Sequence, residues 1–479
     1  MLKILTREEY ERRAAESRRV AVFREFLADR ETPVAALSRL GEDEECFLLE
    51  SVAGGETRGR YSFLGIEPCA KVEGADALED LRRRFAECRY AAAPELPPFQ
   101  GGAVGYIAYD AVALFEPRVG ERGTGNGERG TPPMAFLLCD AFLVFDNARN
   151  TVTVVVMADA ATPDAYGAAM RRIDAIYEKM LSAESIARIM GNVERGTGNV
   201  KGREFASEMS KDEFCAMVEK CKAAIAAGEV IQIVPSQKFT ANTDVSGLAL
   251  YRALRMINPS PYNFFMRIGG KTLIGSSPEE LVKLSGRTAS TSPIAGTRPR
   301  GETPLRDAEL ERELKRDPKE LAEHTMLVDL GRNDLGRVCE IGSVKVQSFA
   351  HVERYSHVMH LVSNVTGTLA AGEDGFSLIK SAFPAGTLSG APKVRAMELI
   401  AEYEKSPRGI YGGAAGYFSL TGDMDFAIVI RTLVKEGTTL TMRSGAGIVA
   451  DSDPEREYDE TVNKAKAVFE AVKFAEELQ

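Results

Sequence analysis

Two pairs of glutamates are the residues of this chain whose types and spacing are best suited to chemistry. Glu320 and Glu323 are three residues apart, and so are Glu457 and Glu460. Because side chains at that spacing share one face of a helix, each pair predicts two carboxylates that point the same way. If the two faces converge, a hard cation must offset their repulsion, and an anionic substrate could bind beyond it. The pattern therefore favours a metal-dependent enzyme for a small carboxylated molecule, with two solvated helix faces as the simpler alternative.

Basic side chains and glycine-rich turns in the second half of the chain are suited to holding such an anion. Arg431 lies in an apolar run, where a guanidinium usually needs an anionic partner. Lys464 follows Glu460 by one helical turn and can reach either that glutamate or a substrate carboxylate. The Gly445–Gly447 turn offers backbone N–H groups to a ligand, with a tight strand-to-helix connection as the alternative. The turn around Thr387 also suits a small anion, and it lacks the spacing of a nucleotide-binding phosphate loop.

The composition of the chain is that of an ordinary globular protein and excludes several classes of function. Its 479 residues suggest about two to three domains. The formal charge of −10 argues against a surface for nucleic acid or for anionic membranes. No segment has the ~18 consecutive apolar residues of a membrane-spanning helix, and the charged N-terminal segment does not resemble a signal peptide. The seven cysteines are scattered without a Cys-x-x-Cys pair, which predicts a cytoplasmic protein without a thiolate zinc site.

The elements that must position these residues alternate between groups of strands and groups of helices. Helices are predicted at 319–330 and 454–478, where they carry the two glutamate pairs, and a strand is predicted at 425–435, where it carries Arg431. Many predicted strands follow one another directly, as they do in hairpins. We therefore predict an α+β fold with large, mostly antiparallel β-sheets, rather than a doubly wound parallel sheet.

A polar segment offers the best boundary between domains. We expect an N-terminal domain at 1–190, a linker at 191–210, and a catalytic domain at 211–479. Residues 1–20 are predicted to form a charged helix. A Ser-Lys-Asp-Glu capping box predicts that another helix begins near Ser210.

Several longer motifs of the chain resemble those of one enzyme family. In order and spacing they are similar to the chorismate-binding enzymes, and most of all to the anthranilate synthase component I branch of that family. The resemblance covers roughly residues 15–475, and it implies that the sheets pack as a sandwich with helices on the outside. The motifs are Asn258-Pro-Ser-Pro-Tyr262, Gly275-Ser-Ser-Pro-Glu279, Pro293-Ile-Ala-Gly-Thr297, Glu323-His-Thr-Met-Leu-Val-Asp329, Ser356-His-Val-Met-His-Leu-Val362, Phe383-Pro-Ala-Gly-Thr-Leu-Ser-Gly-Ala-Pro-Lys393 and Gly445-Ala-Gly-Ile-Val-Ala-Asp-Ser-Asp-Pro-Glu455.

In that family, carboxylates at matching positions bind magnesium, which holds the ring carboxylate of chorismate. The resemblance implies that Glu323 and Glu460 are Mg²⁺ ligands here, with Glu320 and Glu457 as water-mediated neighbours. It also implies a set of groups that bind the substrate. These are Gly296, Thr297, Tyr411, Arg431, Gly445, Ala446, Gly447 and Lys464.

The catalytic residues implied by the resemblance are His360 and Glu279 as acid/base groups, Thr387 in the lining of the ring pocket, and Gln232. Two positions favour one product. Family members that use water generally carry a lysine at the position of Gln232, suited to deprotonating water, and glutamine cannot do so. Aminodeoxychorismate synthases commonly carry a lysine nucleophile at the position of Ala295. We therefore expect ammonia to attack chorismate directly, giving anthranilate and pyruvate.

Two other functions stay open from the sequence. Some aminodeoxychorismate synthase components I manage without the lysine nucleophile. A non-catalytic homologue could instead bind chorismate or tryptophan for regulation. The two glutamate pairs, together with Arg431 and Lys464, argue against this last alternative.

The resemblance also implies a partner and an inhibitor. The chain has no Gly-x-Cys-x-Gly turn of a glutaminase, so a separate glutamine amidotransferase subunit in an α2β2 assembly would supply the ammonia. Segments 48–51 and 60–62 resemble the site at which tryptophan inhibits this first step of its own biosynthesis, with a plain core strand at 48–51 as the alternative. Asn263 replaces the methionine that is frequent in the family. The predicted tryptophan-binding residues are Glu50, Ser51, Pro261, Tyr262 and Asn263.

Overall fold

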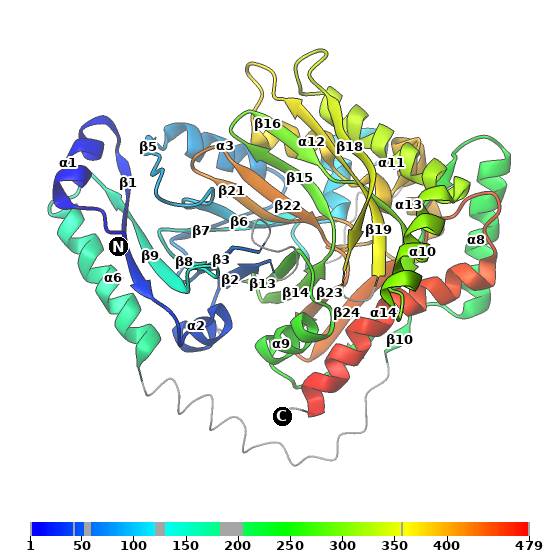
Figure 1. Cartoon of the computed structure of the whole chain (residues 1–479), viewed down its shortest axis with the longest axis horizontal. Coiled ribbons are helices and arrows are strands. Elements are labelled where there is room, and N and C mark those ends of the chain that lie inside the picture. Colours follow the sequence, from blue (N-terminus) through cyan, green and yellow to red (C-terminus); the bar gives the residue numbers. More distant parts are fainter. Residues whose placement is uncertain are drawn as a thin grey trace.

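The computed structural model describes residues 2–41, 44–51, 59–119, 130–182, 205–355 and 358–477. Two large β-sheets pack against each other, and helices surround them (Figure 1). The described strand pairs are antiparallel apart from the parallel pair of β1 (Arg19–Leu27) and β5 (Tyr90–Ala91). The predicted α+β fold with mostly antiparallel sheets is confirmed.

The first sheet has 12 strands and runs through the lower part of Figure 1. It starts from the short edge strand β10, at the right of Figure 1, and ends at β5, at the left. In spatial order its strands are β10 (Ala206–Ser207), β12 (Ser236–Asn242), β24 (Thr439–Gly445), β23 (Thr432–Glu436), β14 (Lys271–Ser277), β13 (Tyr262–Ile268), β2 (Cys46–Glu50), β3 (Tyr61–Gly65), β8 (Ala141–Asp146), β9 (Thr151–Asp159), β1 and β5.

The second sheet has 10 strands, and a separate two-stranded sheet pairs β11 (Gln232–Ile233) with β20 (Gly390–Ala391). In the second sheet, β18 (Lys345–Arg354) lies beside β19. The other strands, in spatial order, are β17 (Ile294–Pro299), β19 (Val358–Thr368), β16 (Thr288–Thr291), β15 (Glu280–Ser285), β22 (Met424–Ile428), β21 (Ala414–Ser419), β6 (Gly102–Ile107), β7 (Met134–Cys139) and β4 (Ala70–Glu73).

Aromatic side chains fill the space where the two sheets meet. Phe63 of the first sheet and Tyr417 of the second have ring centroids 6.1 Å apart, and Phe99 contacts both rings. Tyr417 and Phe63 are buried, so the contact removes large apolar surfaces from water. The sheets therefore form the expected sandwich, whose core runs between them.

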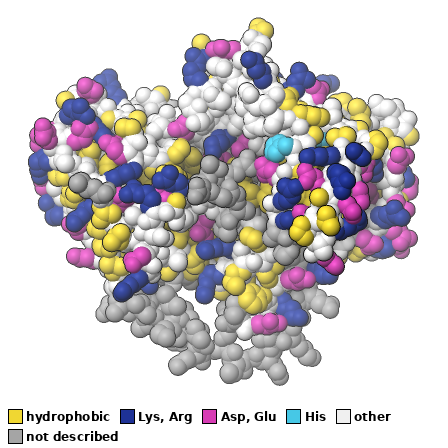
Figure 2. Space-filling view, in the orientation of Figure 1, with side chains coloured by type: hydrophobic (Ala, Val, Ile, Leu, Met, Phe, Trp, Pro, Cys, Tyr) yellow, Lys and Arg dark blue, Asp and Glu magenta, His cyan; other side chains and the backbone are white. Residues whose placement is uncertain are grey.

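Helices cover the outer faces and ends of this sandwich, and basic and acidic side chains are interspersed over the face seen in Figure 2. In Figure 1, α14 runs beside α9 and β24. Helix α11 packs against β17 and β19. None of the described helices is long and apolar enough to cross a membrane. The helices are α1 (Arg7–Glu16), α2 (Pro33–Leu40), α3 (Ala77–Glu87), α4 (Val112–Phe115), α5 (Pro117–Val119), α6 (Ala165–Leu181), α8 (Lys211–Ala226), α9 (Gly247–Ile257), α10 (Pro304–Arg316), α11 (Pro318–Gly336), α12 (Gly375–Ala382), α13 (Lys393–Tyr403) and α14 (Pro454–Glu477), with 3-10 turns at Tyr109–Ala111 and Gly386–Leu388.

Two predicted elements differ from the structure. The helix expected over residues 1–20 ends at Glu16, and the strand β1 follows from Arg19. The strand expected at 425–435 is broken into β22 and β23, and Arg431 lies in the bend between them with a positive φ of 48°. By contrast, the capping box at Ser210 begins α8 as predicted.

Both sheets combine strands from the two sides of the expected domain boundary. In the first sheet, β13 pairs with β2, so that Asn263 faces Glu50 across the ladder. In the second sheet, β21 pairs with β6. Most of the linker predicted at 191–210 lies outside the described residues, and the division into 1–190 and 211–479 stays a prediction.

Candidate active site

The two glutamate pairs lie near the beginnings of two helices, α11 and α14. Each helix starts with a proline, which has no N–H to leave unpaired there. The carboxylate of Asp317 caps α11 by accepting hydrogen bonds from the backbone N–H groups of Lys319 (3.0 Å) and Glu320 (3.3 Å). The positive end of a helix dipole favours negative charge in its first turn, which is where Glu320 and Glu457 lie.

One cavity of about 610 Å³ receives side chains from both helices. A volume of this size suits a small-molecule site. The cavity is lined by every residue that the sequence predicts for catalysis, metal binding or substrate binding, except Ala446. That residue is fully buried beside the cavity, and its backbone N–H donates to the carbonyl of Pro235. The predicted residues that line the cavity are Gln232, Glu279, Gly296, Thr297, Glu320, Glu323, His360, Thr387, Tyr411, Arg431, Gly445, Gly447, Glu457, Glu460 and Lys464.

The carboxylates at this cavity repel one another. Burial is the main cause that raises the pKa of Glu323, and the charges of Glu320 and Glu460 raise it further. Burial also raises the pKa of Glu457, with a contribution from Glu460. The side-chain amide of Gln232 lowers the pKa of Glu323 by donating to its Oε1 at 2.9 Å. The acidic faces of the two helices therefore meet at this cavity, which the spacing of the glutamates alone left open.

The donor chemistry of these carboxylates fits a magnesium ion. In the part of the chain that the structure describes, no three acidic, histidine or cysteine side chains are grouped closely enough to hold a metal. Arg298 pairs with Glu320 at 2.9 Å, and Lys464 pairs with Glu460 at 2.7 Å. Magnesium prefers carboxylate oxygens, and a divalent cation would offset the repulsion that raises the pKa of Glu323. The residues present therefore suit the ion.

His360 of β19 is oriented by the strand beside it. Its Nδ1 lies 3.2 Å from the carbonyl of Gly296 and 3.0 Å from the hydroxyl of Thr297. Because a carbonyl only accepts, the contact with Gly296 favours the neutral tautomer that has its hydrogen on Nδ1 and its lone pair on Nε2. Burial, the main cause, lowers the pKa of His360, and Arg431 lowers it further. The ring is thus a neutral group that can take up a proton at Nε2.

Glu279 is the second acid/base candidate. Its side chain is buried, and burial raises its pKa to about 8, against smaller lowering effects from the Thr387 hydroxyl, the Ile294 backbone and the Lys464 charge. At neutral pH the carboxyl group is therefore protonated and can donate a proton. The raised pKa of Glu279 keeps its proton available at neutral pH, and the lowered pKa of His360 keeps its ring unprotonated.

An arginine and two glycines also line the cavity. Arg431 is bonded to the Oδ1 of Asn258 at 3.1 Å, and within the described ranges it forms no ion pair with a carboxylate. Burial lowers its pKa. A Cβ at Gly445 would lie 2.9 Å from the hydroxyl of Tyr411, and one at Gly447 would lie 2.8 Å from Nε2 of Gln232. A side chain at either position would collide with these neighbours, so both positions require glycine.

Comparisons with known proteins identify the family. A family model described as chorismate binding enzyme matches residues 44–470. The chain belongs to the chorismate-binding enzyme family. It is 42% identical over 499 residues to anthranilate synthase component 1 of Neisseria meningitidis serogroup B, with 99% of each chain covered. It is 45% identical over 462 residues to anthranilate synthase component 1 of Streptomyces coelicolor, with 95% of this chain and 89% of the relative covered. The crystal structure of anthranilate synthase component I from Streptococcus pneumoniae has a TM-score of 0.77 at 34% identity, with 93% of this chain and 99% of that chain covered.

This chorismate-binding enzyme has a second large cavity, of about 520 Å³, between the two sheets. All five residues predicted for tryptophan line it, namely Glu50, Ser51, Pro261, Tyr262 and Asn263. Glu50 is buried and accepts hydrogen bonds from Tyr251 (2.6 Å) and Arg255 (3.0 Å). The side chain of Asn263 is also bonded, donating to the carbonyl of Ser260 at 2.7 Å.

Sequence reasoning missed two arginines at the site of this chorismate-binding enzyme. Arg298 pairs with Asp317 and Glu320, and so joins the start of α11 to β17. Arg443 lines the main cavity from β24 and is buried. Arg443 precedes Gly445 by two residues in a run of strand-forming residues. Because a buried guanidinium usually needs a partner, an arginine in such a run could have been identified as a candidate site residue.

Proposed function

We propose that this chain is the component of anthranilate synthase that converts chorismate and ammonia into anthranilate, pyruvate and water. The observation that carries the proposal is the single cavity that gathers the acidic faces of α11 and α14 with Arg431, Lys464 and Glu279. Chorismate carries two carboxylates, which need a cation and basic side chains. It also carries a hydroxyl group, which needs a proton before it leaves.

In the proposed reaction, the chain's own groups bind the substrate first. Arg431 and Lys464 bind its carboxylates by charge-assisted hydrogen bonds, together with the backbone N–H of Gly447. Glu323 and Glu460 would hold a magnesium ion, with Glu320 and Glu457 bound to it through water. The bound ion would supply positive charge for the ring carboxylate.

The chemical steps then use the acid and the base. Ammonia adds to ring carbon C2 and then gives up one proton, both ring double bonds shift, and the C4 hydroxyl leaves as water with the proton of Glu279. His360 assists the loss of the C2 proton at its Nε2. The bond between the ring and the enolpyruvyl oxygen breaks, and pyruvate and aromatic anthranilate are released. Proton transfers by positioned groups of this kind contribute about 10²- to 10⁴-fold each.

The choice of ammonia and of the product is supported by two residues of the cavity wall. Gln232 is bonded to Glu323 and has no basic group with which to activate water. Ala295 presents no nucleophile to the ring. Direct attack by ammonia at C2 is the reaction that such a wall suits.

We further propose how the enzyme is supplied and regulated. A separate glutamine amidotransferase subunit delivers ammonia, in an α2β2 assembly in the cytoplasm. L-Tryptophan binds in the second cavity and inhibits the first step of its own synthesis. Support comes from the lining of that cavity by Glu50, Ser51 and Asn263.

The test is to incubate the purified chain with chorismate, magnesium chloride and ammonium chloride at alkaline pH and to follow the fluorescence of anthranilate. We expect turnover that depends on both magnesium and ammonium. A non-aromatic 4-amino product would instead assign the chain to aminodeoxychorismate synthesis. A folded protein without turnover would overturn the catalytic assignment.

Variants of the proposed ligands sharpen this test. Glu323→Gln and Glu460→Gln should each need roughly tenfold or more extra magnesium for half-maximal rate. Glu313→Gln is the matched control, because that glutamate is exposed on α10 and pairs only with Arg306 among the described side chains. Full activity of Glu323→Gln at limiting magnesium would contradict the ligand assignment.

A further inference from the structure

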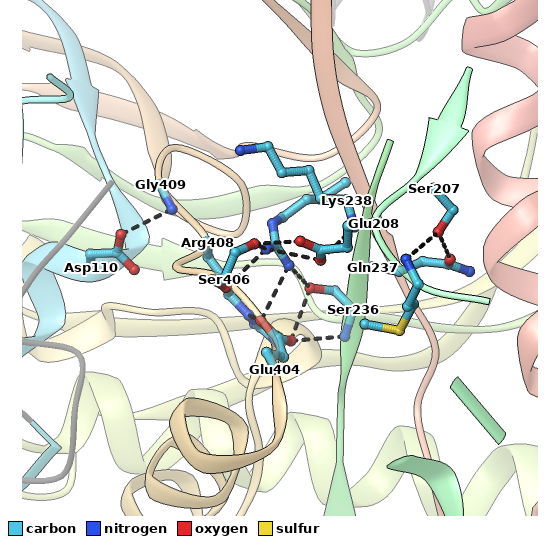
Figure 3. Close-up of polar contacts among 12 residues, drawn as sticks. Asp110, Ser207, Glu208, Ser236, Gln237, Lys238, Glu404, Ser406, Arg408 and Gly409 are labelled. Atoms are coloured by element: carbon cyan, nitrogen blue, oxygen red, sulfur yellow. Dashed lines mark hydrogen bonds and ion pairs between the residues drawn. The ribbon is translucent and has the colours of Figure 1, made fainter. Parts of the chain in front are cut away.

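A buried cluster of charged and polar groups lies directly behind the active-site wall. Its centre is the carboxylate of Glu404, just after α13, and the side chains of Ser236 and Arg408 point toward it (Figure 3). Oε1 of Glu404 accepts hydrogen bonds from the backbone N–H and the hydroxyl of Ser236 (2.8 and 2.9 Å) and from Arg408 (2.6 Å). The Glu404 and Arg408 side chains are only 4% and 2% exposed.

The guanidinium of Arg408 reaches three separate segments of the active-site cavity. It donates to the carbonyl of Leu388 at 2.6 Å and to the carbonyl of Val234 at 2.5 Å. It also lies over the ring of Tyr411, 5.8 Å from the ring centroid, with Tyr109 at 4.5 Å. Val234, Leu388 and Tyr411 all line the cavity, whereas Arg408 does not.

A second arginine connects the same carboxylate to the glycine turn of the site. Arg443 of β24 donates to the hydroxyl of Ser236 at 3.1 Å and to the carbonyl of Ser406 at 2.9 Å. It also lies 3.4 Å from Oε2 of Glu404. Gly445, two residues further on, opens the turn that carries the backbone of Gly447 to the cavity.

The cluster extends to the helix that carries the second glutamate pair. Gln237 follows Ser236 on β12 and donates from Nε2 to the hydroxyl of Thr461 at 2.6 Å. Thr461 is the neighbour of Glu460 on α14. The hydroxyl of Ser207 fixes the other end of the Gln237 amide by donating to its Oε1 at 2.6 Å (Figure 3).

Stability alone does not account for this arrangement. A buried ion pair is frequently no more stabilising than apolar side chains of similar volume, since both charges lose their water. Apolar side chains, however, have no donors for the carbonyls of Val234 and Leu388. Lysine has only a point charge and three donors, and it lacks the planar group that lies over the rings of Tyr109 and Tyr411. The cluster therefore has the donors and the planar group that are needed to fix the position of the cavity wall.

We propose that Arg408, held by Glu404, is a positioning residue that sets the place of Tyr411 and of the Val234 and Leu388 segments against the substrate. Its effect on turnover rests on the proposed function, because Tyr411 is there assigned to substrate binding. A shift of the reacting groups by about 1 Å can slow catalysis roughly 100-fold.

The kinetic test compares Arg408→Lys with Arg39→Lys. Arg39 is a matched control, since it forms an ion pair with Glu31, donates to the carbonyl of Met180 at 2.9 Å and is 11% exposed, far from the cavity. We expect kcat/KM for chorismate to fall about 100-fold in Arg408→Lys and to stay within about threefold of wild type in Arg39→Lys.

Coupling to Tyr411 separates positioning from a loss of folding. In a Tyr411→Phe background, Arg408→Lys should lower kcat/KM by a much smaller factor than it does alone, because the hydroxyl that Arg408 helps to position is already absent. Losses that multiply fully in the double variant would overturn the proposal. If Arg408→Lys does not fold, Ser236→Ala, which removes one donor to Glu404, takes its place with an expected loss of about tenfold.

Hydrogen–deuterium exchange needs no turnover, so it tests the positioning role of Arg408 separately from the proposed function. Arg408→Lys should speed hydrogen–deuterium exchange in peptides covering 386–392 and 411–413, whereas Arg39→Lys should not. Unchanged exchange there would overturn the positioning role, even for a fully active enzyme. A wild-type chain without turnover would refute the proposed function. Increased exchange in Arg408→Lys would still support the positioning role of Arg408.

Discussion

The side-chain amide of Gln232 donates to Oε1 of Glu323 at 2.9 Å, although the two residues come from different parts of the fold. Gln232 lies in the two-residue strand β11, and Glu323 lies in the second turn of α11. Gly447 has no side chain to separate them, as a Cβ there would be 2.8 Å from Nε2 of Gln232. Gln232, which we expect to separate ammonia-using from water-using members of the family, therefore also supports a proposed metal ligand.

Removing this support should weaken magnesium binding. In Gln232→Leu the carboxylate of Glu323 loses its donor, and we expect about 10- to 100-fold weaker magnesium affinity, measured by calorimetry and by the magnesium dependence of turnover. Gln347→Leu is the control, because Gln347 is exposed and bonded only to Thr366 among the described partners. Equal magnesium affinity in both variants would show that the contact is incidental.

Glu279 should impose an upper pH limit on the reaction. Since burial raises its pKa to about 8, the carboxyl group is protonated below that pH, and the proton donor is lost as pH rises through it. At constant free ammonia, kcat should therefore fall above pH 8, and Glu279→Gln should lower kcat by about 100-fold or more and remove that limb.

The neighbouring carboxylate gives the control for this pH dependence. Glu280 lines the second cavity rather than the first, and it accepts from the hydroxyl of Tyr262 at 3.2 Å. Glu280→Gln should keep the fall above pH 8. If the wild-type profile has no such limb, Glu279 is not the acid.

Arg431 should act mainly through substrate affinity. Its guanidinium is bonded to Asn258 and is available to a substrate carboxylate in the cavity. Arg431→Met should raise KM for chorismate roughly 10- to 100-fold, the range for a lost charge-assisted hydrogen bond, with a smaller change in kcat. Arg287→Met, at a surface pair with Glu340, should leave KM unchanged. An unchanged KM in Arg431→Met would exclude the proposed contact.

One bulky side chain in the second cavity should weaken tryptophan inhibition without changing the reaction in the first cavity. Ser51 is half-buried at its lining, so Ser51→Phe places a ring in the space proposed for tryptophan. We expect the tryptophan concentration for half-inhibition to rise at least about tenfold, while the rate without tryptophan changes less than about twofold. Ser17→Phe, at a half-buried position after α1, should keep normal inhibition. Inhibition that survives in Ser51→Phe would place the inhibitor elsewhere.

Local patterns predicted the helices that present the acidic groups. The spacing of Glu320 and Glu323 and the capping box at Ser210 are patterns within one or two helical turns, and the helices that they predicted are present. Hairpin-like runs of strands were also sufficient to predict antiparallel sheets, because their alternation is set by neighbouring residues.

Local patterns failed where a distant contact decides the backbone. The apolar residues around Arg431 continue like one strand, yet the chain bends there to a positive φ, and the carbonyl of Arg431 accepts from the N–H of Ser276. Local patterns likewise could not predict the partners of Arg298, Arg408 and Arg443, since each pairs with groups on another element.

The sequence by itself determined the chemistry of this protein: paired carboxylates, an arginine and a lysine for anions, and glycines where a ligand must approach. The tertiary structure decided that these groups face one cavity, that Glu279 is buried enough for its pKa to rise to about 8, and that Arg408 braces the wall from behind. The physical reason is the distance along the chain over which each effect acts. Residue type and helical spacing act over a few positions, whereas burial and convergence depend on strands far apart in the chain, such as β2 and β13, pairing in one sheet.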